Sequence, residues 1–155
     1  MIPVELQRLL HERVKNLFSD HLFKNSKNED VHINIFKQHL PPKKTKDDEP
    51  YPYIIIKLIE GEQLEEENPF QSQIMFVIGL YAEEDPYQGY LDVTMIIQKI
   101  FNDLKTNPVV GSNFELQYPV KWALHDEDVY PYYFGGIETT WSTPSIIRRD
   151  VEAMI

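Results

Sequence analysis

The order of its β-rich and helical segments constrains this chain most. Three β-rich segments precede one amphipathic helix, two more follow it, and another helix begins the chain. Strands grouped in runs, rather than alternating with helices, are typical of α+β folds and not of parallel α/β sheets. The order α-β-β-β-α-β-β therefore predicts a single, mainly antiparallel sheet of about five strands, with both helices packed on one face.

Apolar residues at three- and four-residue steps predict the two helices. The first covers about Val4–Phe23, with Pro3 in the first turn, where a missing N–H costs nothing. The second follows Asp85-Pro86, a capping residue and a first-turn proline, and ends at Asn107-Pro108. Its apolar positions are Val93, Ile96, Ile97, Ile100, Phe101 and Leu104.

Five segments with β-branched and aromatic residues are predicted strands. The second of them is nearly all apolar, which is typical of a buried strand, and the third is apolar on both faces. The third is therefore a central strand, or it has a face that a partner covers. The fourth alternates strictly, and Pro119 in its middle indicates an edge strand or a bulge. The five segments are 31–36, 53–59, 72–83, 114–124 and 133–143.

Two loops are long for a chain of 155 residues. Residues 40–52 contain four prolines and many charges, so we expect an exposed loop. Residues 62–69 form a second, acidic loop. We expect one α+β domain over residues 1–143 and, after Pro144 breaks the last strand, a C-terminal tail over residues 144–155.

Composition excludes several classes of function. The chain has no cysteine, which excludes disulfides, thiol catalysis and Cys-ligated zinc. Its net charge is −10, from 25 acidic and 15 basic residues, whereas a duplex-binding protein needs a basic surface. No apolar run approaches the roughly 18–20 residues of a membrane helix, and the N-terminus lacks the pattern of a signal peptide. We therefore expect neither nucleic-acid specificity nor membrane insertion.

No motif in the sequence names a reaction. The histidines fall in no metal-binding spacing, and phosphate-binding loops and nucleophile elbows are absent. The densest set of potential ligands is His125-Asp126-Glu127-Asp128, which lacks the spacing of an EF-hand; a weak cation site there stays open. We expect no enzyme, no catalytic residue and no cofactor or resident metal.

Aromatic residues indicate protein partners instead. The chain has nine tyrosines, and several lie next to prolines, at residues 51–53, 86–90 and 130–133. Tyrosine and tryptophan are enriched at interfaces, and the neighbouring residues here are acidic, unlike those of a nucleic-acid stacking platform. Packing of these rings within their own loops is the alternative interpretation. The candidate interface residues are Tyr81, Met75 and Val77 on the second face of the third strand, and Lys43, Lys44, Glu65 and Glu66 in the two long loops.

The layout resembles the tail-terminator (head–tail joining) proteins of long-tailed bacteriophages and prophages, over about residues 1–143. The resemblance depends on a first helix leading into a strand, on two hydrophobic strands joined by a loop, on a helix, and on two last strands that carry aromatic residues up to Trp141. Residues 144–155 have no counterpart in it. The sequences that carry it are Val4–Phe23, Pro52-Tyr53-Ile54-Ile55-Ile56-Lys57-Leu58-Ile59, Ile78-Gly79-Leu80-Tyr81, Gly89-Tyr90-Leu91-Asp92 and Ile100-Phe101-Asn102-Asp103-Leu104.

This resemblance implies a structural protein of the virion without catalytic residues. Such proteins form a homo-oligomeric ring, typically a hexamer, that caps the tail tube and joins tail to head. The implied partners are the tail-tube protein and the head connector protein. The implied location is the tail–head junction of the virion, and the bacterial host cytoplasm during assembly. Alternatives are another phage connector or tail-tube module, a small acidic ligand-binding domain around residues 125–128, and a cellular adaptor.

Overall fold

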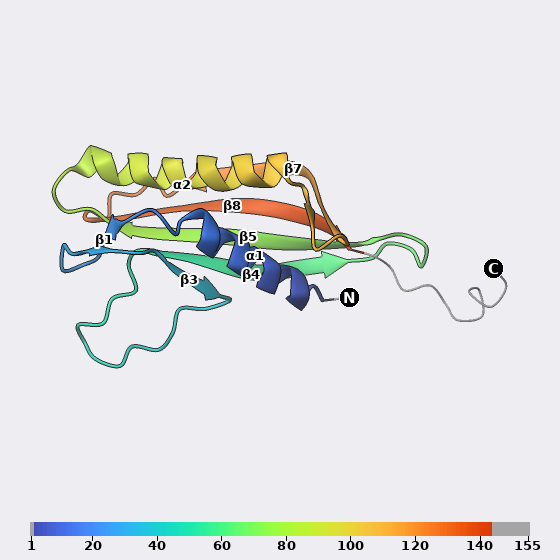
Figure 1. Cartoon of the computed structure of the whole chain (residues 1–155), viewed down its shortest axis with the longest axis horizontal. Helices are drawn as coiled ribbons and strands as arrows, with labels where there is room; N and C mark the ends of the chain where they lie inside the picture. The colour runs from blue at the N-terminus through green and yellow to red at the C-terminus, as the bar shows by residue number, and fades with distance from the viewer. Residues whose placement is uncertain (1, 144–155) are drawn as a thin grey trace.

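The computed structural model describes residues 2–143, so the predicted tail over residues 144–155 lies outside the described residues. The chain has an α+β fold in which α1 (Val4–Leu17) and α2 (Pro86–Thr106) lie on the same side of a curled, six-stranded sheet (Figure 1). The order of the strands across the sheet is β3 (Asn34–Lys37), β4 (Tyr53–Glu62), β5 (Phe70–Tyr81), β8 (Tyr132–Thr143), β7 (Phe114–Leu124) and β6 (Val109–Val110).

Strand β5 lies in the middle of this sheet, as its two apolar faces predicted. It pairs antiparallel with β4 on one side and with β8 on the other, and the β7–β8 and β6–β7 pairs are antiparallel too. Only β3 pairs in parallel, with β4. The prediction of a mainly antiparallel sheet is therefore confirmed.

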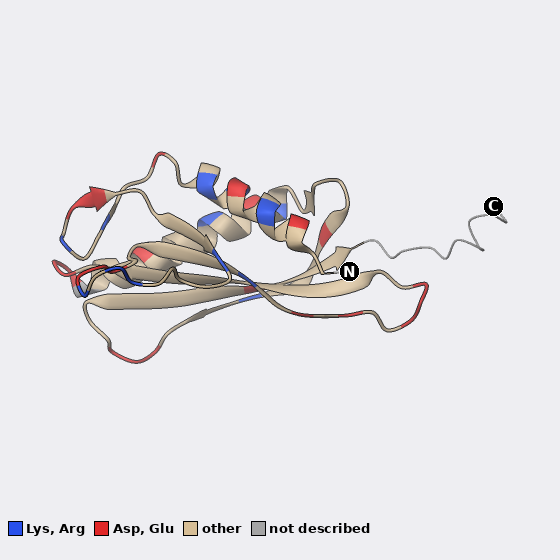
Figure 2. Cartoon of the chain, turned by 90° about the horizontal axis from the view of Figure 1, so that it is seen from below, with Lys and Arg blue, Asp and Glu red and all other residues tan. Residues whose placement is uncertain are grey.

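The hydrophobic core lies between the helices and one face of the sheet. Alternate residues of β4 and β5, such as Ile54 and Phe76, point to this face and are fully buried. Leu10 of α1 and Ile96 of α2 are equally buried in the same cluster. Figure 2 shows both helices on one side of the sheet, and the described chain places no helix on the other side. This second side is called the open face below.

Three details differ from the sequence-based expectations. The first helix ends at Leu17, not at Phe23, because the chain turns there: Phe18 caps the helix and is buried in the core. Residues 23–24 form β1 (Phe23–Lys24) instead, which pairs with β2 (Asp30–Val31) in a separate two-stranded sheet. The predicted strand over 31–36 is therefore split between β2 and β3, and β6 raises the main sheet from the expected five strands to six.

Two glutamine side chains close the edge of β4 where β3 ends. Gln38, just after β3, accepts a hydrogen bond from the Leu58 N–H and donates one to the Leu58 carbonyl, both at 2.9 Å. Its side-chain amide thus forms the two hydrogen bonds with Leu58 that a further residue of β3 would otherwise form. Gln7 of α1 donates to the Ile56 carbonyl at 2.8 Å and to Gln38 Oε1 at 3.0 Å. The helix is therefore attached to the edge of the sheet through the buried amide of Gln7 and the half-buried amide of Gln38.

The helices are joined to each other by one ion pair. Arg13 Nε donates to Asp103 Oδ2 at 2.6 Å, and Arg13 Nη2 donates to the Asp103 backbone carbonyl at 2.8 Å. Asp103 lies in the last turn of α2, where a carboxylate is unfavourable beside the negative end of the helix dipole. The guanidinium of Arg13 offsets both negative charges and holds the helices side by side.

We expect Gln38→Asn to lower the free energy of unfolding by about 1–3 kcal/mol, because it removes two hydrogen bonds with Leu58 that contribute about 0.5–1.5 kcal/mol each. Gln38 has a φ of 70°, a left-handed conformation that asparagine also tolerates. The variant therefore shortens the side chain by one methylene group without straining the backbone. Urea unfolding measures the loss. The matched control is Gln98→Asn on the outer face of α2, which should change stability by less than about 0.5 kcal/mol. Equal stability of the two variants would show that the amides do not hold the edge.

Candidate functional site

The middle of the open face carries the apolar residues that the sequence identified on the second face of this strand. Met75 and Val77 of β5 alternate with the buried Ile74 and Phe76, so they point to the open face, where both are half-buried. Val77 pairs with Ile55 of β4, and on its other side it pairs with a glycine of β8. The prediction that Met75 and Val77 share a face with Tyr81 is confirmed by this register, and their role in an interface stays a prediction.

Five aromatic rings gather at one end of the open face. The tyrosine cluster consists of Tyr51, Tyr53, Tyr81, Tyr132 and Phe134. The Tyr51 ring is at the centre, with its centroid 4.7 Å from that of Tyr132 and 5.3 Å from that of Tyr53. Gly79 makes room for the Tyr53 ring, because a Cβ at this position would lie 2.3 Å from it. Of the tyrosines near prolines that the sequence singled out, Tyr51, Tyr53 and Tyr132 thus pack against one another, whereas Tyr87 and Tyr90 are exposed.

Carboxylates accept hydrogen bonds from two hydroxyls of the tyrosine cluster. Tyr132 donates to Glu49 at 2.9 Å, and Tyr81 donates to Glu83 at 2.5 Å. The hydrogen bond to Glu83 is the main cause that raises the pKa of Tyr81 to about 12. The hydrogen bond to Glu49 likewise raises the pKa of Tyr132. Burial raises the pKa of Tyr51 further, so the cluster is held in its neutral form well above physiological pH.

The charged candidates lie far apart. Lys43 and Lys44 are exposed in the loop between β3 and β4, which adjoins the tyrosine cluster through Glu49. Glu65 and Glu66 are exposed in the turn between β4 and β5, at the opposite end of the sheet (Figure 1). The structure therefore does not join these four residues into one site. It places the loop with Lys43 and Lys44 at one end and a glutamate-rich turn at the other.

The side chains of the acidic loop over residues 125–128 are not arranged around a common point that could hold a metal cation. His125 Nε2 lies 3.9 Å from Glu127 Oε2, and both side chains are exposed. Within residues 2–143, no group of three or more His, Cys, Asp or Glu residues is arranged to hold a metal ion. Neither of the helices in this range combines the length and hydrophobicity needed to cross a bilayer.

Strand β7 exposes two large aromatic residues that sequence reasoning placed in a half-buried strand. Tyr118 and Trp122 are each 63% exposed. The register between β7 and β8 shifts between Gln117 and Lys121, so the strict alternation of the sequence is broken. Pro119 was the signal for this irregularity, and the expectation of an edge or a bulge is confirmed. The regular apolar pattern predicted a half-buried strand and gave no sign that these two rings are exposed.

The outer edge of β7 is open beyond its first residues. β6 pairs with Phe114 and Glu115 only, so within the described part of the chain residues 117–124 have no strand partner on that side. Unpaired N–H and C=O groups on such an edge are a template for another chain. Tyr118 and Trp122 therefore lie within the stretch of β7 whose outer backbone groups have no strand partner.

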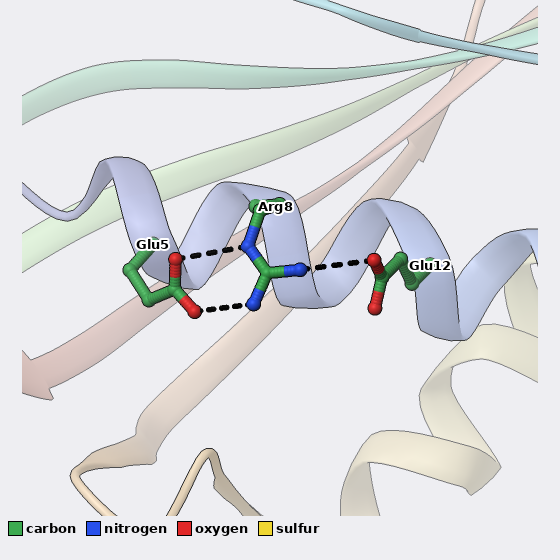
Figure 3. A network of polar contacts seen from close by, with 3 residues as sticks. All are labelled: Glu5, Arg8 and Glu12. Carbon is green, nitrogen blue, oxygen red and sulfur yellow. Dashed lines mark hydrogen bonds and ion pairs between the residues drawn. The ribbon is translucent and has the colours of Figure 1, made fainter.

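The outer face of α1 contrasts with this edge, because its charges are already paired. Arg8 donates from Nε to Glu5 and from Nη1 to Glu12, each at 2.9 Å (Figure 3). The hydrogen bond and charge of Glu5, together with Glu12, raise the pKa of Arg8 above its already high ordinary value. This charged face is typical of a helix surface in contact with water.

Comparison with known proteins identifies no family for this chain. No protein family model matches the sequence, and no curated protein is similar to it. One solved chain is similar over 92% of this chain and 93% of its own length, with 10% sequence identity and a TM-score of 0.49. A likeness of that level supports no conclusion about function.

The tyrosine cluster should weaken the fold at high pH. A raised folded-state pKa favours the neutral phenol; this stabilisation is complete below about pH 10, where unfolded tyrosine titrates, and is lost as the pH rises through the folded-state pKa. We expect urea unfolding to show lower stability at about pH 11 than at about pH 9. Tyr51→Phe keeps the ring without its hydroxyl and should reduce this loss, whereas Tyr118→Phe, at an exposed ring outside the cluster, should not. An identical loss in both variants would contradict the assignment.

Proposed function

We propose that this protein is a non-catalytic virion structural protein that caps the phage tail tube as a ring and joins tail to head. The resemblance in layout that the sequence shows is the source of the specific role. The observation that supports the conclusion that the chain is a subunit of an assembly is the contrast between the two edges of the sheet. One edge is closed by the chain itself, and the other is open and aromatic.

The closed edge carries several features that prevent pairing with a second chain. β3 has only four residues, and the proline-rich loop over residues 40–52 follows it. Beyond β3, the amides of Gln7 and Gln38 occupy the edge groups of β4. Short edge strands and prolines are the usual means by which proteins block edge-to-edge pairing. The β7 edge has one such feature, Pro119 with its register shift, so its open part is the stretch after this proline. The two edges therefore differ, which favours a contact between one edge and a different patch on the next copy.

A directional contact is what a ring requires. When one patch binds a different patch on the next copy, the assembly closes if the rotation between copies closes. We propose that the β7 edge, with Tyr118 and Trp122, is one of the two patches. Exposed tryptophan and tyrosine are the residue types that contribute most binding energy at interfaces. The net charge of −10 opposes association, so apolar contact of this kind is needed to overcome it.

The two ends of the sheet would then face the two partners. The loop with Lys43 and Lys44 and the turn with Glu65 and Glu66 lie at opposite ends (Figure 1). A cap that touches the tail-tube protein on one side and the head connector on the other needs two separate surfaces. The first loop has three lysines and three acidic residues, whereas the turn has acidic charges alone, so the two surfaces differ in support of the proposed partners.

Native mass measured at several concentrations, with and without tail tubes, tests the proposal. We expect a closed ring, a hexamer by resemblance, that forms at high concentration or on the tube. Trp122→Ser should shift the equilibrium toward monomer by at least about tenfold, the effect of losing a hot-spot residue. Tyr87→Ser is the matched control, because Tyr87 is 74% exposed but lies at the start of α2.

A chain that stays monomeric under every condition, tubes included, would contradict the ring. Assembly into long tubes in sedimentation would support the alternative of a tail-tube module. Equal effects of the two substitutions would refute the role of β7 while leaving the ring itself intact.

A further inference from the structure

A cavity that the proposed ring does not use lies beside the first turns of α2. The loop that joins β7 to β8 and the first residues of β8 form the rest of its wall. Its volume is about 350 Å³, which is within the range of sites that bind small molecules. It is called the α2 cavity below, and the residues that define it are Tyr87, Tyr90, Leu124, Glu127, Asp128 and Tyr133.

Three tyrosines border the α2 cavity. Tyr87 and Tyr90 are three residues apart in α2, so they lie on the same face of the helix, and both are exposed. Tyr133 of β8 lies against the same turn of the helix, because a Cβ at Gly89 would be 2.2 Å from its ring. The absence of a side chain at Gly89 therefore brings an aromatic residue of the sheet next to two of the helix. Val93 adds apolar surface one turn further along α2.

The cavity has acidic groups at its border and no basic partner for them. Glu127 and Asp128 are exposed there, and no lysine or arginine borders the cavity. In the part of the chain that the structure describes, neither carboxylate forms an ion pair with a lysine or an arginine. Residues 81–98 and 122–143, which supply the whole wall, contain eight acidic residues and no lysine or arginine.

The negative charges act at the ring of Tyr133. Burial is the main cause that raises the pKa of Tyr133, and the nearby Tyr130, Asp128 and Asp85 raise it further. The two carboxylates therefore repel an anion at this side of the cavity and attract a cation. Asp85 also caps α2, so its charge offsets the positive end of the helix dipole, which alone would favour an anion.

We propose that the α2 cavity binds a small organic cation, an ammonium group that carries methyl or methylene groups. Tyrosine rings attract such a cation within about 6 Å of their faces, and they also contact its apolar groups. A metal ion needs several oxygen ligands around one point, and residues 2–143 contain no such group. The ammonium group can belong to a free molecule or to the lysine side chain of another protein, since the chemistry that the cavity recognises is the same.

Titration of the monomeric protein with choline tests this proposal, with amide chemical shifts in NMR spectra as the readout. The control ligand is dimethylbutanol, a neutral molecule of the same shape with carbon in place of the nitrogen. We expect choline to shift amides of residues 87–93 and 124–134, and to bind at least about tenfold more tightly than the neutral control. Equal affinities, shifts confined to other residues, or no binding would each overturn the proposal.

A pair of variants tests the carboxylate with net charge held equal. Asp128→Asn removes one charge at the cavity, and asparagine can still accept the hydrogen bond that Asp128 accepts from the Tyr130 N–H at 3.1 Å. Asp126→Asn removes one charge from the same loop at an exposed residue that does not border the cavity. We expect Asp128→Asn to weaken choline binding about threefold and Asp126→Asn to have a much smaller effect. Equal effects would show that net charge alone attracts the ligand and would overturn the site.

A second pair of variants tests the aromatic wall. Tyr90→Leu keeps an apolar side chain but removes the ring, and we expect it to weaken choline binding at least about threefold. Tyr118→Leu, at an exposed ring on β7, should leave the affinity unchanged. Thermal melts confirm that all variants are folded. An unchanged affinity in Tyr90→Leu would refute the role of the rings.

N-acetyl-lysine amide is the probe that distinguishes the two sources of the ammonium group. Tighter binding of this probe than of choline would assign the cavity to the lysine side chain of a protein partner, and the reverse order would assign it to a free small molecule. Because the titrations use monomer and small ligands, their failure is distinguishable from failure of the proposed ring.

Discussion

The structure depends on a central strand that is apolar on both faces but covered by helices on only one. On the covered face, Ile74, Phe76 and Ile78 of β5 are fully buried beneath α1 and α2. On the open face, Met75 and Val77 remain half-buried, and the tyrosine cluster covers only one end. Burial of apolar area is the main stabilising force, so one face holds the fold together while the other remains available for contact.

Local patterns in the sequence were sufficient for the elements that pack against this central strand. The helical repeat after Asp85 predicted α2 with its cap, and Asp85 does accept a hydrogen bond from the Tyr87 N–H. Local patterns did not predict the features that depend on contacts between residues far apart in the sequence. Residues 23–24 leave the predicted helix because Phe23 pairs with Val31, and residues 31–36 divide between two sheets because Asn34 pairs with Tyr53 instead.

The candidate site was harder to predict, because exposure depends on neighbours in space. Alternation placed Met75 and Val77 on a common face correctly, since strand geometry alone determines this. The same alternation in β7 did not indicate that Trp122 is exposed, because the exposure of this ring depends on the shifted register and on how far α2 extends over the sheet. Which edge of the sheet is closed depended on Gln38, a residue that no sequence pattern singled out.

Hydrogen–deuterium exchange of the assembled and the monomeric protein tests most directly whether the open edge of β7 is the contact surface. Backbone amides that face solvent on this edge, within residues 117–124, should exchange slowly only after assembly. Amides of α1 near Arg8 should exchange at the same rate in both states, because that face stays in water. Protection of α1 with no change along β7 would contradict the account.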